Sequence, residues 1–117
     1  MTFYPIAPVA APRMTRRDKW LNRPIVAEYF AFRNNIRARG IEIPIPSKVT
    51  FWVKMPDSWS RKKRELMLRQ PHEQTPDIDN FLKAILEAVF DKKDAKVWSI
   101  WPEKRWSNNP GIEVIPL

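Results

Sequence analysis

Residues 75–90, TPDIDNFLKAILEAVF, hold the side chains of this chain that are best suited to chemistry. Asp77 and Asp79 are two residues apart, and Lys83 follows one helical turn later. Inside a helix, two residues at that spacing point about 200° apart. Pro76 biases the residue before it away from helical geometry, so we expect Asp77 to precede the helix and Asp79 to lie in its first turn. The two carboxylates can then converge.

Converging carboxylates are suited to a hard cation such as Mg²⁺, which takes oxygen ligands and keeps several of its waters. A metal ion held by two or three aspartates can activate a water molecule and stabilise the charge on a phosphate that is being cleaved. A lysine beside them offsets the negative charge that develops there. The pattern therefore favours metal-assisted cleavage of a phosphodiester.

A simpler interpretation of the same residues stays open. Aspartates at a helix N-terminus bond its free N–H groups and suit the helix dipole. Asp79 and Lys83, four residues apart, can also form a surface ion pair. Capping does not account for Asn80, nor for Asp91 and Asp94 in the charged turn that follows the helix.

The helix expected from residue 78 to about residue 90 is amphipathic, so it needs other elements to pack on. On a wheel of about 100° per residue, one face carries the apolar residues Ile78, Phe81, Leu82, Ile85, Leu86 and Val89. The opposite side carries Asp79, Asn80, Lys83 and Glu87.

Two further helices are predicted. Arg23–Arg39 has Pro24 in its first turn, a position that suits proline, and Gly40 ends it. Its core-facing stripe consists of Ile25, Tyr29, Phe32 and Ile36. A shorter helix is predicted within residues 58–70, capped by Ser58 or Ser60.

Strands are predicted where β-branched and aromatic residues gather. They are Thr2–Ile6, Lys48–Met55, Lys96–Trp106 and Ile112–Ile115. The turn signal SNNPG between the last two predicts that they form an antiparallel hairpin. The order is strand, helix, strand, helix, helix, strand, strand. We expect one α+β domain over residues 1–117, with helices packed on a small mixed or antiparallel sheet.

The composition favours a polyanionic partner. The chain has 117 residues, a net charge of +8 and a pI of about 10.1, which raises the odds of a nucleic acid or an anionic membrane surface. It has no cysteine and one histidine, which excludes disulfides, thiolate metal sites and a histidine cluster. No stretch is apolar enough to span a membrane, and the proline-rich start is a poor signal peptide. We expect a cytoplasmic protein.

Two basic segments are candidates for contact with phosphates, although each can equally be a solvated surface. The first is the loop within residues 7–19, with Arg13, Arg16, Arg17 and Lys19. The second is the short helix and its C-terminal flank, with Arg61, Lys62, Lys63, Arg64 and Arg69.

The stretch TPDIDNFLKAILEAVF followed by DKKDAKV resembles the signature of RusA-like Holliday junction resolvases, a family common in prophages. The matching features are an Asp-x-Asp-Asn helix start, a lysine four residues after the second aspartate, and an aspartate before a short strand. The upstream stretch SWSRKKRELMLRQPH resembles the basic segment of phage members. The resemblance covers Trp52 to the C-terminus well and the first 50 residues loosely.

This resemblance implies a RusA-like fold and a homodimeric endonuclease that binds four-way DNA junctions and nicks opposed strands. It implies Mg²⁺ as cofactor, with Mn²⁺ as a substitute. By matching position, Asp77, Asp79 and Asp94 would be catalytic metal ligands, and Lys83 the catalytic lysine. Many members have an acidic residue immediately before the third aspartate, where this chain has Lys93. That departure leaves the number of metal ions open.

Two rival functions remain. A non-catalytic DNA-binding relative would use the basic segments for DNA and the aspartates as caps. A protein that binds an acidic partner or a lipid surface ranks last, because no amphipathic membrane helix is predicted.

Overall fold

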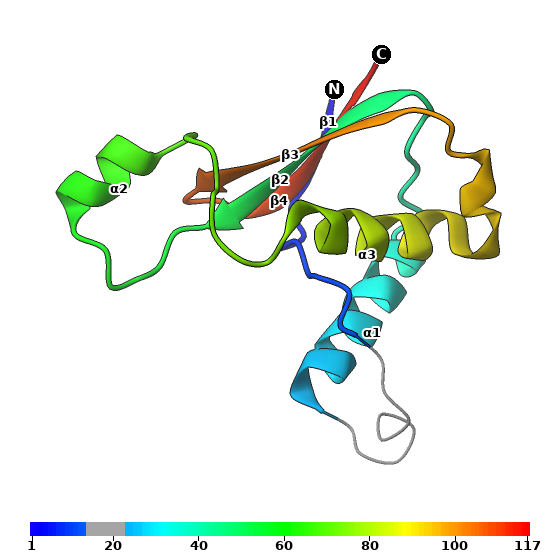
Figure 1. Ribbon diagram of the computed structural model, residues 1–117, viewed down its shortest axis with the longest axis horizontal. Coiled ribbons are helices and arrows are strands. Elements are labelled where there is room, and N and C mark those ends of the chain that lie inside the picture. The colour runs from blue at the N-terminus through cyan, green and yellow to red at the C-terminus, as the bar shows by residue number, and fades with distance from the viewer. Residues whose placement is uncertain (14–22) are drawn as a thin grey trace.

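The computed structural model describes residues 1–13 and 23–117 (Figure 1). Its elements are β1 (Thr2–Tyr4), α1 (Pro24–Ala38), β2 (Ser47–Lys54), α2 (Arg61–Met67), α3 (Ile78–Phe90), the 3₁₀ helix η2 (Asp91–Lys96), β3 (Ile100–Ser107) and β4 (Gly111–Pro116). The predicted α+β class and the predicted order of strands and helices are confirmed. No helix in the described part of the chain is both long and apolar enough to cross a membrane.

The four strands form one mixed sheet in the order β1-β4-β2-β3. β2 runs parallel to β3 and antiparallel to β4, and β4 pairs with β1. The predicted hairpin of the last two strands is therefore wrong, because β2 lies between them. β2 is buried almost continuously from Ser47 to Trp52, as suits a central strand, whereas the polar β3 suits an edge.

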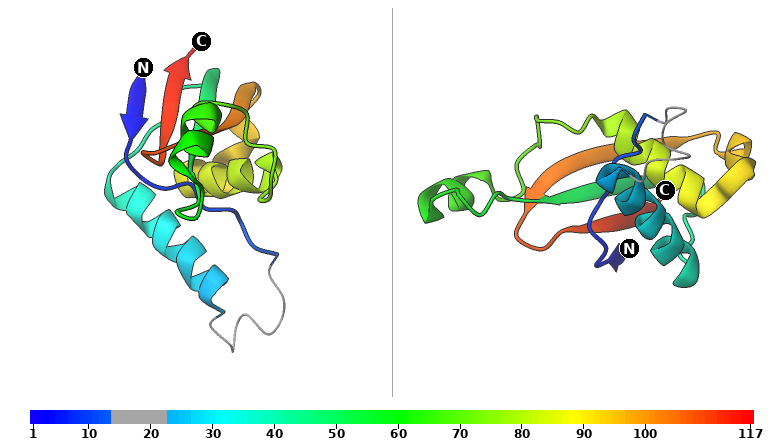
Figure 2. Two further views of the ribbon diagram at one scale, coloured as in Figure 1. Left: turned by 90° about the vertical axis from the view of Figure 1, so that its left-hand side faces the viewer. Right: turned by 90° about the horizontal axis from the view of Figure 1, so that it is seen from below.

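The helices α1 and α3 pack on one face of the sheet (Figure 2). Val49 and Phe51 of β2 point into this core, with Val53 partly buried beside it, as predicted. In α1 the buried stripe begins at Val26, and Ile25 is 47% exposed, so the predicted start of the stripe was off by one residue.

The buried face of α3 is centred on small residues. Ala84 and Ala88 are buried beside Phe81 and Ile85, in the core that α3 shares with α1 and the sheet. Leu82 and Leu86 are only partly buried, so they lie at the shoulder of the apolar face.

α2 projects from one end of the sheet, and none of its residues is buried (Figure 1). We call residues 57–68 the arm. Ser60 caps α2 by accepting a hydrogen bond from the backbone N–H of Lys63, at 3.2 Å, which decides between the two predicted capping serines. At the base of the arm, Trp59 packs on Trp106 of β3, with 4.7 Å between the ring centroids.

Candidate active site

Asp77 and Asp79 lie where the sequence predicts them. Asp77 is the N-cap of α3, with an extended backbone at φ −66° and ψ 150°, and Asp79 is in the first turn. The Asp77 side chain makes no capping hydrogen bond. Capping therefore does not explain the aspartate at this position.

One side of α3 borders a hollow of about 300 Å³. Its lining residues are Asp79, Leu82, Lys83, Leu86, Glu87 and Asp94. The hollow thus brings together Asp79, Lys83 and Asp94, three of the four predicted catalytic residues, from α3 and η2. Asp77 is exposed at the N-cap and is not among the lining residues.

Within residues 1–13 and 23–117, Asp79, Lys83 and Asp94 form no ion pair with one another or with any other side chain. The alternative in which Asp79 and Lys83 pair on the helix surface is therefore not realised. Both carboxylates and the ammonium group remain available to a ligand.

The donor set of this hollow fits Mg²⁺. In the described residues, no three Asp, Glu, His or Cys side chains form a ready-made metal cluster. Mg²⁺ does not need such a cage, because it is commonly held by one or two carboxylates, several waters and the phosphate of a substrate. Asp79 and Asp94 can provide the two carboxylates, and the exposed Asp77 lies two residues before Asp79.

The placement of Asp94 depends on a sharp change of direction after α3. Asp91 has a positive φ of 52°, where the chain leaves α3 and enters η2. Arg37 of α1 holds this end of the helix, with Nη2 3.2 Å from both the Glu87 carbonyl and Asp91 Oδ1. Its Nε also donates to the Ala88 carbonyl at 3.2 Å. Together these three hydrogen bonds of Arg37 help to fix the course of the chain from α3 toward Asp94.

Glu87 is a member of the hollow to which the sequence assigns no role. It follows Asp79 and Lys83 at successive steps of four, so the three residues form one stripe along α3. This spacing is the sequence signal that could have placed Glu87 beside Asp79 and Lys83. Its Oε2 accepts a hydrogen bond from the hydroxyl of the buried Tyr29. Burial, and then this bond with the nearby Glu87 charge, raise the pKa of Tyr29 to about 12.

The first basic segment begins beside this site. The backbone N–H of Ala11 donates to the carbonyl of Asn80 at 3.0 Å, which attaches the N-terminal segment to the start of α3. Arg13 follows two residues later and is exposed. Arg16, Arg17 and Lys19 lie outside the described residues.

The five cations of the second basic segment lie in three different settings. Arg61, Lys62 and Lys63 are exposed on the arm. Arg64 instead bonds the arm internally, with Nη2 2.6 Å from the Pro56 carbonyl and Nε 3.2 Å from the Trp59 carbonyl. We therefore expect Arg64 to shape the arm more than to contact DNA.

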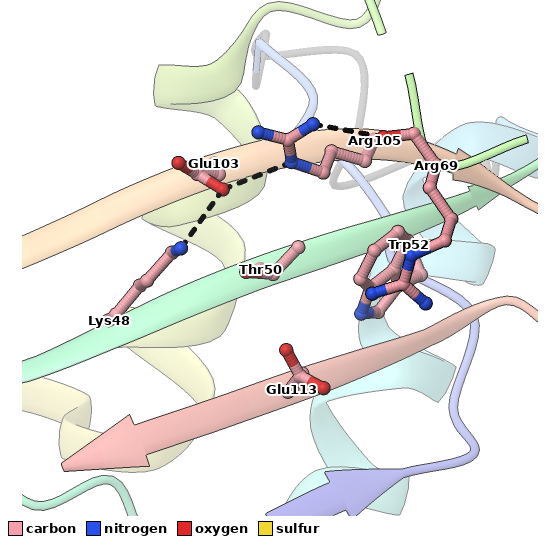
Figure 3. A pocket seen from close by; sticks show the side chains of 7 residues that line it. All are labelled: Lys48, Thr50, Trp52, Arg69, Glu103, Arg105 and Glu113. Carbon is pink, nitrogen blue, oxygen red and sulfur yellow. Dashed lines mark hydrogen bonds and ion pairs between the residues drawn. The ribbon is translucent and has the colours of Figure 1, made fainter. Parts of the chain in front are cut away.

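Arg69 lies on the sheet face opposite the helices, in a second hollow of about 250 Å³ (Figure 3). Its guanidinium is 4.9 Å from the centre of the Trp52 ring. Beside it, Glu103 interacts with Lys48 at 3.3 Å and with Arg105 at 3.2 Å. Partial burial raises the pKa of Glu103, but the hydrogen bonds from these two cations outweigh it and hold the pKa below its ordinary value. This hollow is separate from the one beside α3.

Comparison with known proteins agrees with these features. The model of the family described as endodeoxyribonuclease RusA matches residues 5–115, a range that includes the Asp77–Lys83 motif, Asp94 and both basic segments. No curated protein and no solved structure matches the chain. The family match extends through the N-terminal region, where the motifs alone gave a loose resemblance. The chain belongs to the endodeoxyribonuclease RusA family.

Proposed function

We propose that this protein is an Mg²⁺-dependent endonuclease that cuts four-way DNA junctions. The observation that carries the proposal is the hollow beside α3. Asp79, Lys83 and Asp94 all line it, and within the described residues none of them forms an ion pair. Membership of an endodeoxyribonuclease family supports the same reaction class.

The side chains have separate roles in this proposal. Asp79 and Asp94 would hold the metal ion, and Asp77 would join them from the N-cap. A bound Mg²⁺ would supply an activated water and stabilise charge on the phosphate. Lys83, whose ammonium has no partner in the described chain, would face the scissile phosphate and offset its developing charge.

The positive charge of the rest of the chain explains how DNA reaches an acidic site. A net charge of +8 attracts the phosphate backbone over a long range, whereas the carboxylates repel it only locally. The candidate phosphate contacts are Arg13, whose carbonyl bonds Arg23 at the start of α1, and Arg61, Lys62 and Lys63 on the arm, with Arg69 on the outer sheet face.

A four-way junction offers two symmetry-related strands for cutting, so we further propose a homodimer with one site for each strand. Sedimentation velocity of the purified chain tests this point. A monomer that nicks only one strand of each junction would contradict it.

The test of the reaction uses a synthetic four-way junction and a duplex of the same sequence. We expect the wild-type protein to nick the junction with Mg²⁺ or Mn²⁺ and to bind it without nicking in EDTA. Asp79→Asn should bind the junction with wild-type affinity and cut at least 100-fold more slowly, a loss of about 2.7 kcal/mol of transition-state stabilisation. Asp77→Asn should also lose most cleavage.

The matched control is Glu73→Gln, which removes one exposed carboxylate four residues before Asp77. It should cut at the wild-type rate. If Asp77→Asn and Asp79→Asn cut as fast as wild type, the site is wrong. Binding of the junction in both buffers with no product in either would instead favour the non-catalytic DNA-binding protein.

A further inference from the structure

Lys104 of β3 bonds to the loop that delivers Asp77 to the start of α3. Its Nζ is 2.5 Å from the carbonyl oxygen of Gln74 and 2.8 Å from that of Pro76. Both oxygens precede Asp77 by one to three residues, and both lie far from Lys104 in sequence. A single ammonium group thus joins the sheet to the loop.

The backbone of Lys104 is a firm base for this contact. It lies opposite the buried Phe51 of the central strand β2 in the parallel pairing of the sheet. On its other side, the Lys104 carbonyl accepts the backbone N–H of His72 at 3.0 Å. Residues 69–72 therefore run beside the outer edge of β3. Among the hydrogen bonds of the described residues, those of the Lys104 side chain continue this attachment to residues 74–76, just before α3.

The Pro76 carbonyl belongs to the peptide unit that joins Pro76 to Asp77. Because a peptide unit is planar, a hydrogen bond to its oxygen also restricts the orientation of the Asp77 nitrogen and Cα. On the other side, the Asp77 carbonyl accepts the N–H groups of Asn80 and Phe81, at 3.1 and 3.4 Å. Asp77 is thus held from both directions through its backbone, which leaves its uncapped carboxylate available.

We propose that Lys104 is a positioning residue for Asp77, and that it sets the affinity of the site for its divalent cation without touching DNA. This inference rests on the proposed function. It assigns to Lys104 a role different from that of Lys83: two of its three N–H donors are engaged by carbonyl oxygens, so it holds the loop and does not face the phosphate.

The experiment compares Lys104→Met, which keeps the length of the side chain and removes its donors, with Lys54→Met. Lys54 is an exposed lysine at the end of β2, and within the described residues its one ion pair is with Asp57. Both variants remove one positive charge. Lys104→Arg, which keeps donors of sufficient reach, is the conservative rescue.

We expect Lys104→Met to raise the Mg²⁺ concentration for half-maximal cleavage about tenfold, with junction affinity in EDTA within twofold of wild type. Lys104→Arg should stay within threefold of the wild-type Mg²⁺ requirement, and Lys54→Met should equal wild type. A wild-type Mg²⁺ requirement in Lys104→Met would overturn the inference, as would an equal shift in Lys54→Met. If Lys104→Met melts below the assay temperature, Lys104→Gln replaces it with the same expected result.

A second readout needs neither DNA nor activity. Hydrogen exchange of the metal-free protein should be faster in Lys104→Met at the amides of Asn80 and Phe81, which bond the Asp77 carbonyl, and unchanged at Ile85 in the middle of α3. Unchanged exchange at Asn80 and Phe81 would contradict the positioning role even if wild type cuts no DNA. Failure of wild type to cut any junction with Mg²⁺ or Mn²⁺ would contradict the proposed function alone.

Discussion

The hydroxyl of Tyr29 on α1 donates a hydrogen bond to Oε2 of Glu87 on α3. Tyr29 is only 4% exposed, and Glu87 lines the hollow with Asp79 and Lys83. The bond therefore connects the interior contact of the two helices to the candidate site. It also satisfies a hydroxyl that burial would otherwise leave unpaired.

Tyr29→Phe removes this donor while it keeps the buried ring. We expect the free energy of unfolding to fall by about 1.5–3 kcal/mol, as for other hydrogen bonds to charged groups. Urea unfolding followed by tryptophan fluorescence measures the change. Tyr4→Phe is the control, because the Tyr4 hydroxyl has no hydrogen-bond partner among the described residues. Equal stability of the Tyr29→Phe variant and wild type would show that the bond contributes nothing.

The two acidic residues of η2 should behave differently. Asp94 lines the hollow, whereas Asp91 is exposed and pairs with Arg37. Asp94→Asn should therefore abolish junction cleavage and leave junction binding intact. Asp91→Asn should cut at near the wild-type rate and lose at most about 0.5 kcal/mol of stability, since exposed ion pairs contribute little. Junction cleavage assays and thermal melts of both variants measure these two effects. The reverse ranking in cleavage would move the third carboxylate to Asp91.

The start of the candidate site could be predicted from the sequence because its signals are local. Pro76, the apolar spacing of α3 and the Asp-x-Asp pair all lie within one short stretch, and they correctly predict the bounds of α3 and the position of Asp77 outside it. The approach of Asp94 to Asp79 and Lys83 has no such local signal. It depends on the positive φ of Asp91 and on the course of η2, which no residue pattern specifies.

Contacts between residues far apart in the chain have no comparable signal in the sequence. The pairing of Tyr29 with Glu87 and of Lys104 with the Pro76 carbonyl joins residues from elements that meet only in the folded chain. The predicted hairpin of the last two strands is wrong for the same reason. A turn signal reports that the chain reverses after β3, but which strand β4 then joins is decided by how deeply β2 is buried.

The exposed cations of the arm can be tested by salt dependence. Lys62 is exposed and forms no ion pair within the described residues. If it contacts a phosphate, Lys62→Ala should weaken junction binding and make the slope of log K against log salt shallower by about 0.9. Arg39→Ala, at the end of α1 and remote from the arm in sequence, removes the same charge and should keep the wild-type slope. Equal slopes in both variants and wild type would exclude Lys62 as a contact.

The only histidine of the chain makes stability depend on pH. His72 is buried against Trp106, with 4.3 Å between ring centroids. Burial, and then the charge of Lys104, hold the pKa of His72 below its ordinary value of 6.5. The unfolded chain therefore takes up a proton at a higher pH than the folded one. As pH falls below 6.5, the free energy of unfolding decreases, and above that pH the histidine has no effect.

His72→Phe keeps an aromatic ring against Trp106 and removes the titrating group. Urea unfolding at pH 7.5, 6.0 and 5.0 should show the wild type losing stability toward low pH, with a smaller loss in the variant. The chain has no cysteine and no second histidine, so no other side chain has an ordinary pKa within this window. A variant that loses as much stability as wild type between pH 7.5 and 5.0 would show that His72 accepts its proton equally well in the folded chain.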